Sequence, residues 1–212
     1  MKRSVVTYLW RMPMGMLAAA MVLLAACSGG GGGGSDSVSS GLSGNFVADV
    51  SPVCPNTATN TLALRKVGVL GKIVTVGIQV TDCDASLGIY GIDFDIRFDP
   101  AVMKCASANP CAAGTLLKSP LATSSPLCVC DNVAGELLGT FTKKFPGTND
   151  TISPGGSKDI VQFTMTVISA GAGRVDFTGN GNLSGTALIT LAGSDPTAIG
   201  GLDYAGGTLT GQ

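Results

Sequence analysis

Residues 90–99 read YGIDFDIRFD, and this stretch decides the fold class. Apolar side chains occupy every even position, whereas glycine, aspartate and arginine occupy the odd positions. Because a β-strand points successive side chains to opposite faces, the alternation predicts a strand with one face in the core. The residues predicted to face the core are Tyr90, Ile92, Phe94, Ile96 and Phe98.

The same alternation extends outward from this stretch to 72–81 (KIVTVGIQVT) and to 160–168 (IVQFTMTVI). Clusters of Gly, Pro, Asn and Asp separate these stretches from shorter strand candidates. The shorter candidates are 61–67, 127–131, 136–142, 174–178, 186–191 and 207–211. No comparable window carries a helical apolar stripe. We therefore predict an all-β domain of about nine strands, arranged as a two-sheet sandwich.

The N-terminus is typical of an export signal. Three basic residues (Lys2, Arg3 and Arg11) accompany an apolar stretch at 12–26, which is too short and too rich in alanine for a membrane span. The stretch ends in Leu24-Ala25-Ala26-Cys27, which resembles a bacterial lipobox. That resemblance implies cleavage before Cys27 and acylation of its sulfur, for which palmitate is the expected chain. An ordinary signal peptide with an incidental cysteine is the alternative.

Ser28 resembles the residue that directs lipoproteins to the outer membrane, so we expect a lipid-anchored protein of the bacterial envelope. Residues 28–44 (SGGGGGGSDSVSSGLSG) cannot bury apolar surface and are predicted to form a flexible tether. The predicted parts are a signal peptide at 1–26, the lipidated Cys27 with its linker at 27–44, and the sandwich at 45–212.

The composition excludes several classes of protein. The chain has no histidine, so it offers no Ser-His-Asp relay and no His-ligated metal. Its formal net charge is −1, and removal of three basic residues with the signal makes this 10 − 14 = −4. That balance argues against nucleic-acid binding. The single tryptophan, Trp10, also leaves with the signal.

Six cysteines remain after Cys27: Cys54, Cys83, Cys105, Cys111, Cys128 and Cys130. An even number in an exported domain favours structural disulfides, although many connectivities are open. We expect Cys105 and Cys111 to pair within one loop, and Cys128 and Cys130 to pair elsewhere, with Cys54 and Cys83 as candidates. Cys128-Val129-Cys130 has one intervening residue, not the two of a redox or zinc motif.

Four stretches together resemble cohesin domains. Phe98-Asp99-Pro100 closes the strand of GIYGIDFDIRFDPAVM (88–103) and precedes a short aliphatic turn, as in that family. The remaining stretches follow in the family's order over about 140 residues. They are GELLGTFT at 135–142, GGSKDIVQFTMTVISAGAGRVDFTG at 155–179 and GGLDYAGGTLTG at 200–211.

The resemblance implies a non-catalytic, jelly-roll-like sandwich whose sheet face docks a dockerin. It places Gly91, Asp93, Asp95 and Arg97 on that partner-binding face, which Lys143 and Lys144 would flank. A carbohydrate-binding module of the same fold, in polysaccharide degradation, and a structural part of an envelope assembly are the alternatives. The six cysteines and the 105–126 segment depart from the family pattern.

Other interpretations of these residues are weaker. Asp82, Asp84, Asp93, Asp95 and Asp99 lack the loop spacing of a calcium site, so we expect no metal and no cofactor. A glycan platform needs exposed aromatic rings, whereas the processed chain keeps only Tyr90, predicted to face the core, and Tyr204. Glu136 has no second carboxylate at a recognisable spacing, so we expect no hydrolase.

Overall fold

A computed structural model describes residues 41–49, 59–83, 87–117, 127–143, 147–179, 185–192 and 194–212. The chain divides after Val38 into two units, and all described residues belong to the second. The predicted signal, Cys27, Cys54, Asp84 and Lys144 lie outside the described residues.

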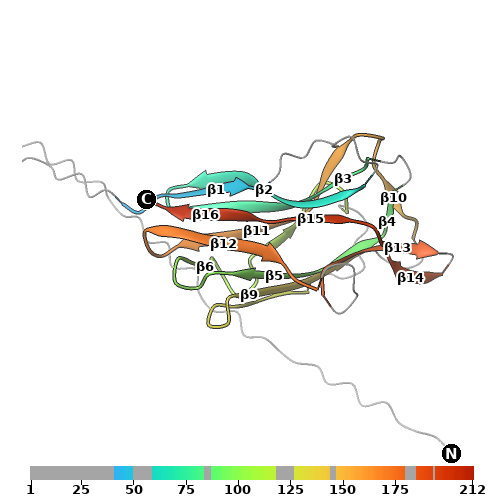
Figure 1. The fold of residues 1–212 in the computed structure, drawn as a ribbon. Helices are drawn as coiled ribbons and strands as arrows, with labels where there is room; N and C mark the ends of the chain where they lie inside the picture. The colour runs from blue at the N-terminus through green and yellow to red at the C-terminus, as the bar shows by residue number, and fades with distance from the viewer. Residues whose placement is uncertain are drawn as a thin grey trace, which may run out of the picture. The chain divides into compact units, whose positions relative to one another are not determined.

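All described secondary structure is β-strand, which confirms the predicted fold class (Figure 1). The described part holds no helix, and therefore none that could cross a bilayer. Nine strands match the predicted ones: β2 (Thr61–Leu70), β3 (Ile73–Thr81), β5 (Gly91–Phe98), β8 (Leu127–Asp131), β9 (Glu136–Thr142), β11 (Ser157–Val167), β12 (Gly171–Phe177), β13 (Ala187–Ala192) and β16 (Gly207–Gly211).

Seven further strands escaped prediction: six have only two to four residues, too few for a clear alternation, and the strand at 44–48 has a single buried residue, Phe46. They are β1 (Gly44–Ala48), β4 (Gly88–Ile89), β6 (Met103–Cys105), β7 (Cys111–Ala113), β10 (Asp150–Thr151), β14 (Asp195–Ala198) and β15 (Asp203–Ala205).

The first sheet, sheet A, is built around β5. Along its whole length β5 pairs with β9, which in turn pairs with the edge strand β8. The opposite edge of β5 pairs with two strands, β12 near Phe98 and β13 near Asp93. β16 and then β1 extend the sheet beyond β12, and β14 pairs with β13.

The second sheet, sheet B, has β3 between β2 and β11. β15 adds to β2 in parallel, while β6 and β7 follow one another along the other edge of β11. Register shifts between Lys66 and Gly68 and between Asp159 and Val161 bend its strands. β4 and β10 form a separate two-stranded sheet.

The core lies between the inner faces of the two sheets. The five residues predicted to face inward from 90–99 are all at most 6% exposed, which confirms the alternation. Phe94 and Phe141 stack within sheet A at a centroid distance of 6.1 Å. From sheet B, Leu64, Ile78 and Phe163 are fully buried.

Two disulfides join the sheets along one side, and they correct the predicted pairing. Cys105 bonds Cys130, and Cys111 bonds Cys128, so the expected Cys105–Cys111 pair is wrong, as is the pairing of Cys128 and Cys130 with Cys54 and Cys83.

The physical reason is the position of β6 and β7. Cys105 lies opposite Met165 of β11 and Cys111 lies opposite Phe163, so the two cysteines face the other sheet two residues apart. Cys128 and Cys130 have the same spacing on one face of β8. Cys83 is also disulfide-bonded.

Candidate functional site

The outer face of β5, β9 and β8 presents three aligned rows of side chains, which we call the docking face. Strand register places Leu127, Thr140 and Asp93 in one row. Val129, Leu138 and Asp95 form the next. Asp131, Glu136 and Arg97 form the third. Directly opposed side chains on neighbouring strands lie about 5 Å apart, so each row acts as one contact surface.

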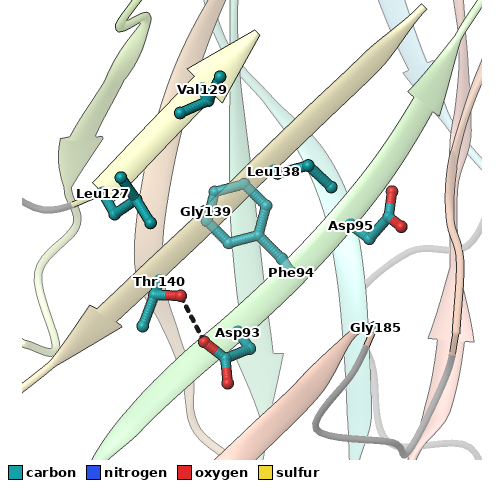
Figure 2. Close-up of a pocket in the computed structure, with 9 residues that line it drawn as sticks. All are labelled: Asp93, Phe94, Asp95, Leu127, Val129, Leu138, Gly139, Thr140 and Gly185. Carbon is teal, nitrogen blue, oxygen red and sulfur yellow. Dashed lines mark hydrogen bonds between the residues drawn. The ribbon is translucent and has the colours of Figure 1, made fainter. Parts of the chain in front are cut away.

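An apolar corner occupies the β8 side of this face. Leu127 is 63% exposed, Val129 51% and Leu138 44%. These side chains line a shallow depression of about 440 Å³ together with Asp93, Asp95 and Thr140 (Figure 2). Exposed apolar side chains that gather around a hollow and are bordered by polar groups are typical of an interaction surface.

Two carboxylates border the apolar corner on β5. Asp93 accepts a hydrogen bond of 2.6 Å from the Thr140 hydroxyl, as Figure 2 shows. Asp95 lies on the same outer face with its carboxylate turned away from β9, and its Oδ1 is buried without a hydrogen-bond partner among the described residues.

The backbone of Asp95 is held in place by the turn region between β12 and β13. Its N–H donates to the Thr186 hydroxyl over 3.0 Å, and its carbonyl accepts from the Thr178 N–H over 2.8 Å. Gly179 and Gly185 approach so closely that a Cβ on either would clash with the other. Gly185 thereby lines the depression without filling it.

The third row adds charge. Arg97 pairs with Glu136 at 3.1 Å. The Asp131 carboxylate accepts from the N–H groups of Ala134 and Val133, and these backbone bonds lower its pKa. The three rows thus carry four carboxylates, those of Asp93, Asp95, Asp131 and Glu136, against one guanidinium, and favour a partner with cations.

The predicted partner-binding residues fall on this face in part. Asp93, Asp95 and Arg97 point outward, with one face of β5 buried and the other open. Gly91 is buried, and a Cβ there would meet the Phe141 carbonyl at 2.7 Å, so it offers no contact surface. Lys143 is also buried and pairs with Asp150 at 2.6 Å, which removes it from the flank.

Sequence reasoning missed the apolar corner. The segment 127–131 reads LCVCD, and its alternation carries the necessary information. Once the cysteines are known to point inward to their disulfides, Leu127 and Val129 must point outward. The disulfide positions were the missing premise.

The described part of the chain offers little support for a metal site or for an aromatic platform that binds glycans. No three His, Cys, Asp or Glu side chains gather there as metal ligands. Its exposed large apolar side chains are aliphatic, without an aromatic ring among them. Tyr204 packs edge-on against Phe177, with ring centroids 5.9 Å apart.

No family model matches the sequence, and no curated protein is similar enough to it to count as a relative. Among solved structures, the chain is similar to a type II cohesin domain from the cellulosome of Acetivibrio cellulolyticus. The TM-score is 0.53 at 16% identity, over 72% of this chain and 95% of that one.

The second type II cohesin module of that organism's adaptor scaffoldin gives a TM-score of 0.51 at 16% identity, covering 72% of this chain and 89% of that one. A chain from its type II cohesin–X-dockerin complex gives 0.50 at 15% identity, over 68% and 94% of the two chains. These likenesses establish the fold, which is a cohesin-like β-sandwich.

Proposed function

We propose that this protein is a non-catalytic binding module whose docking face holds a dockerin-like, extracytoplasmic protein. The observation that carries the proposal is the central row of the face, in which Val129, Leu138 and Asp95 lie side by side. Two exposed aliphatic side chains beside a half-buried carboxylate call for apolar contact and a hydrogen-bond donor. A protein surface supplies both.

The cohesin-like fold supports a dockerin-like protein as the partner. One structural neighbour was solved in a type II cohesin–X-dockerin complex. At 15% identity its contacts do not transfer, so the partner is defined by the chemistry of this chain's own face. That chemistry calls for aliphatic side chains next to lysine or arginine.

The module belongs, in this proposal, to the bacterial cell envelope. Lipid on Cys27 anchors it, the tether at 28–44 separates the domain from the membrane, and Ser28 directs it to the outer membrane. Stable anchoring requires more than one acyl chain, which lipoproteins of this class carry.

The test is recovery of the partner with matched variants. Full-length lipidated protein is used to capture proteins from envelope extracts, and the captured protein is identified and titrated against each variant. Val129→Asp is expected to weaken binding at least about tenfold, because it removes apolar contact and adds a fifth carboxylate. Asp93→Ala/Asp95→Ala is expected to weaken it by a similar factor.

The matched control is Val47→Asp. Val47 is 57% exposed on β1, the far edge of the same sheet, against 51% for Val129 on β8. It should bind like the wild type. Equal binding by all variants would reject the docking face, and retardation of the protein in gels containing cellulose, xylan or peptidoglycan would favour the glycan alternative instead.

A further inference from the structure

The chain enters the described domain at one end of the sandwich, which we call the tether end. Ser43 and Gln212 exchange two backbone hydrogen bonds of 2.9 Å, and the Gly44 N–H donates to the Gly71 carbonyl over 2.9 Å. Figure 1 shows this end where β1 begins and β16 ends. The predicted tether at 28–44 therefore leads into this end.

Backbone hydrogen bonds tie four turns together at the same end. The β2–β3 turn joins the end of β11 through Val167 N–H and Lys72 carbonyl, 2.8 Å apart. The Ile168 N–H donates to the Val102 carbonyl over 2.9 Å, which links the β11–β12 and β5–β6 turns. The β8–β9 turn joins the end of β5 through Phe98 N–H and Gly135 carbonyl at 2.8 Å.

These turns carry the two most exposed large apolar side chains of the described residues. Val133 on the β8–β9 turn is 91% exposed, and Leu70 on the β2–β3 turn is 78% exposed. Ile73, directly opposite Leu70, is 38% exposed, and Ile168 is 44% exposed. Single exposed aliphatic residues are common on protein surfaces, but here the two most exposed ones both lie at the end where the chain enters the domain.

Both extreme side chains are held outward by their turns. The Asp131 carboxylate accepts from the Val133 N–H over 2.8 Å and from the Ala134 N–H over 3.0 Å, which fixes the turn. Leu70 precedes Gly71, whose φ of 57° closes a tight turn. Because both turns are already ordered, the Leu70 and Val133 side chains lose little conformational freedom when a binding partner or a bilayer buries them.

The charges around the tips are mixed. Lys72 and Lys104 are exposed at this end. The carboxylates there already have partners, since Asp99 accepts from the Ala101 N–H over 2.9 Å and Asp131 binds its own turn. The two cations balance the charges of Asp99 and Asp131, so these four groups leave the apolar tips without a net negative charge that would repel phospholipid headgroups.

We propose that the tether end lies against the surface of the anchoring membrane, with Leu70 and Val133 inserted at the bilayer interface. This inference rests on the lipid anchor of the proposed function. A tether of 17 residues spans roughly 20–25 Å on average. The domain then meets the bilayer at an effective concentration on the order of millimolar, so a weak interfacial contact suffices.

The orientation has a consequence for docking. β5, β9 and β8 run away from the tether end, because their third row adjoins its turns and their first row is farthest from them. The docking face would then be roughly perpendicular to the membrane plane and accessible to a partner.

The absence of tryptophan after Trp10 makes the test direct. Leu70→Trp introduces the sole tryptophan of the processed, lipidated protein, which is reconstituted into phosphatidylethanolamine vesicles containing some phosphatidylglycerol. Brominated lipids are expected to lower its emission at least about twofold. Leu127→Trp is the matched control, since Leu127 is also an exposed leucine but lies in the first row, and little quenching is expected there.

Flotation of the vesicles separates the two proposals. Protein that floats while the Leu70→Trp emission is unquenched overturns the orientation and leaves the anchor intact. Protein that does not float overturns both. Equal quenching at positions 70 and 127 also overturns the orientation, as does a blue shift that needs no lipid and weakens on dilution, which would indicate contact with a second copy of this chain.

Discussion

The outer face of sheet B differs from the docking face of sheet A in where its polar groups find partners. On sheet B, Asp159 is 4% exposed and accepts hydrogen bonds from Arg65, Gln79 and Gln162. On sheet A, Asp95 keeps a buried oxygen without a donor among the described residues. Sheet B surrounds its buried carboxylate with donors from its own strands, although Gln79 Oε1 in the same cluster has no partner among the described residues, whereas sheet A leaves aliphatic and acidic groups open to a partner.

The difference has its origin in local geometry. The register shift between Asp159 and Val161 interrupts the regular pairing of sheet B where the Asp159 carboxylate accepts from its three donor residues. β5, β9 and β8 pair without any such shift, so their outward side chains stay in open rows. An irregular sheet can enclose a polar cluster, while a regular one displays its side chains.

The largest expected effect comes from the disulfides that hold β8, the edge of the docking face. Replacing Cys105, Cys111, Cys128 and Cys130 by serine should lower the free energy of unfolding by about 6 kcal/mol, because each of the two bridges contributes about 3 kcal/mol by restricting the unfolded chain. Urea unfolding measures this loss. Hydrogen exchange of the β8 amides should rise first, since β8 pairs with β9 alone. Unchanged β8 protection would show that the bridges do not position the docking face.

The next effect tests the internal cluster of sheet B. Asp159→Ala should lower the free energy of unfolding by about 3 kcal/mol, because it leaves a partly buried guanidinium and two amides without their acceptor. Asp93→Ala, on the docking face, should change it by less than about 0.5 kcal/mol. Similar losses for the two variants, measured by urea unfolding, would remove the contrast between the faces.

The smallest effect concerns an exposed ion pair at the far side of sheet A. Arg174 donates to Asp49 over 2.6 Å and to Asp176 over 2.5 Å, and its hydrogen bond lowers the pKa of the Asp49 carboxyl. A lowered folded-state pKa stabilises the fold above the ordinary carboxyl pKa, and this contribution is lost as the pH falls through the folded value. Because both partners are more than a third exposed, solvent screening keeps it small.

Asp49→Asn should therefore cost about 0.5 kcal/mol near neutral pH and nothing below the folded pKa. Thermal unfolding of both proteins across this pH range is the measurement. A cost that persists in acid would mean that the side chain acts by packing and not by its charge.

Much of the fold could be predicted from the sequence, because alternation is a local property. The stretch 90–99 identifies its own inward and outward residues, and the structure places them accordingly. The outward positions Asp93, Asp95 and Arg97 came from the same pattern. Gly91 and Lys143 did not fit their expected places, because their burial depends on Thr142 and Asp150, which the alternation does not report.

The disulfides show the limit of local reasoning. Cys105 and Cys111 are close in sequence, yet they lie in two different strands, β6 and β7, which both pair with β11. Both cysteines face β8. Their partners on β8 were assigned wrongly because sequence distance does not report which sheet edges meet. For the same reason, the outward orientation of Leu127 and Val129 was not predicted.

By itself, the sequence determined an all-β domain and which side chains of its long strands face the core, since a strand repeats every two residues. Tertiary structure alone decided which strands are neighbours, and with them the three rows, the apolar corner and the two bridges. The physical reason is that strand register depends on pairing between distant segments. Leu127, Thr140 and Asp93 share one row only because β8, β9 and β5 align through hydrogen bonds along their lengths.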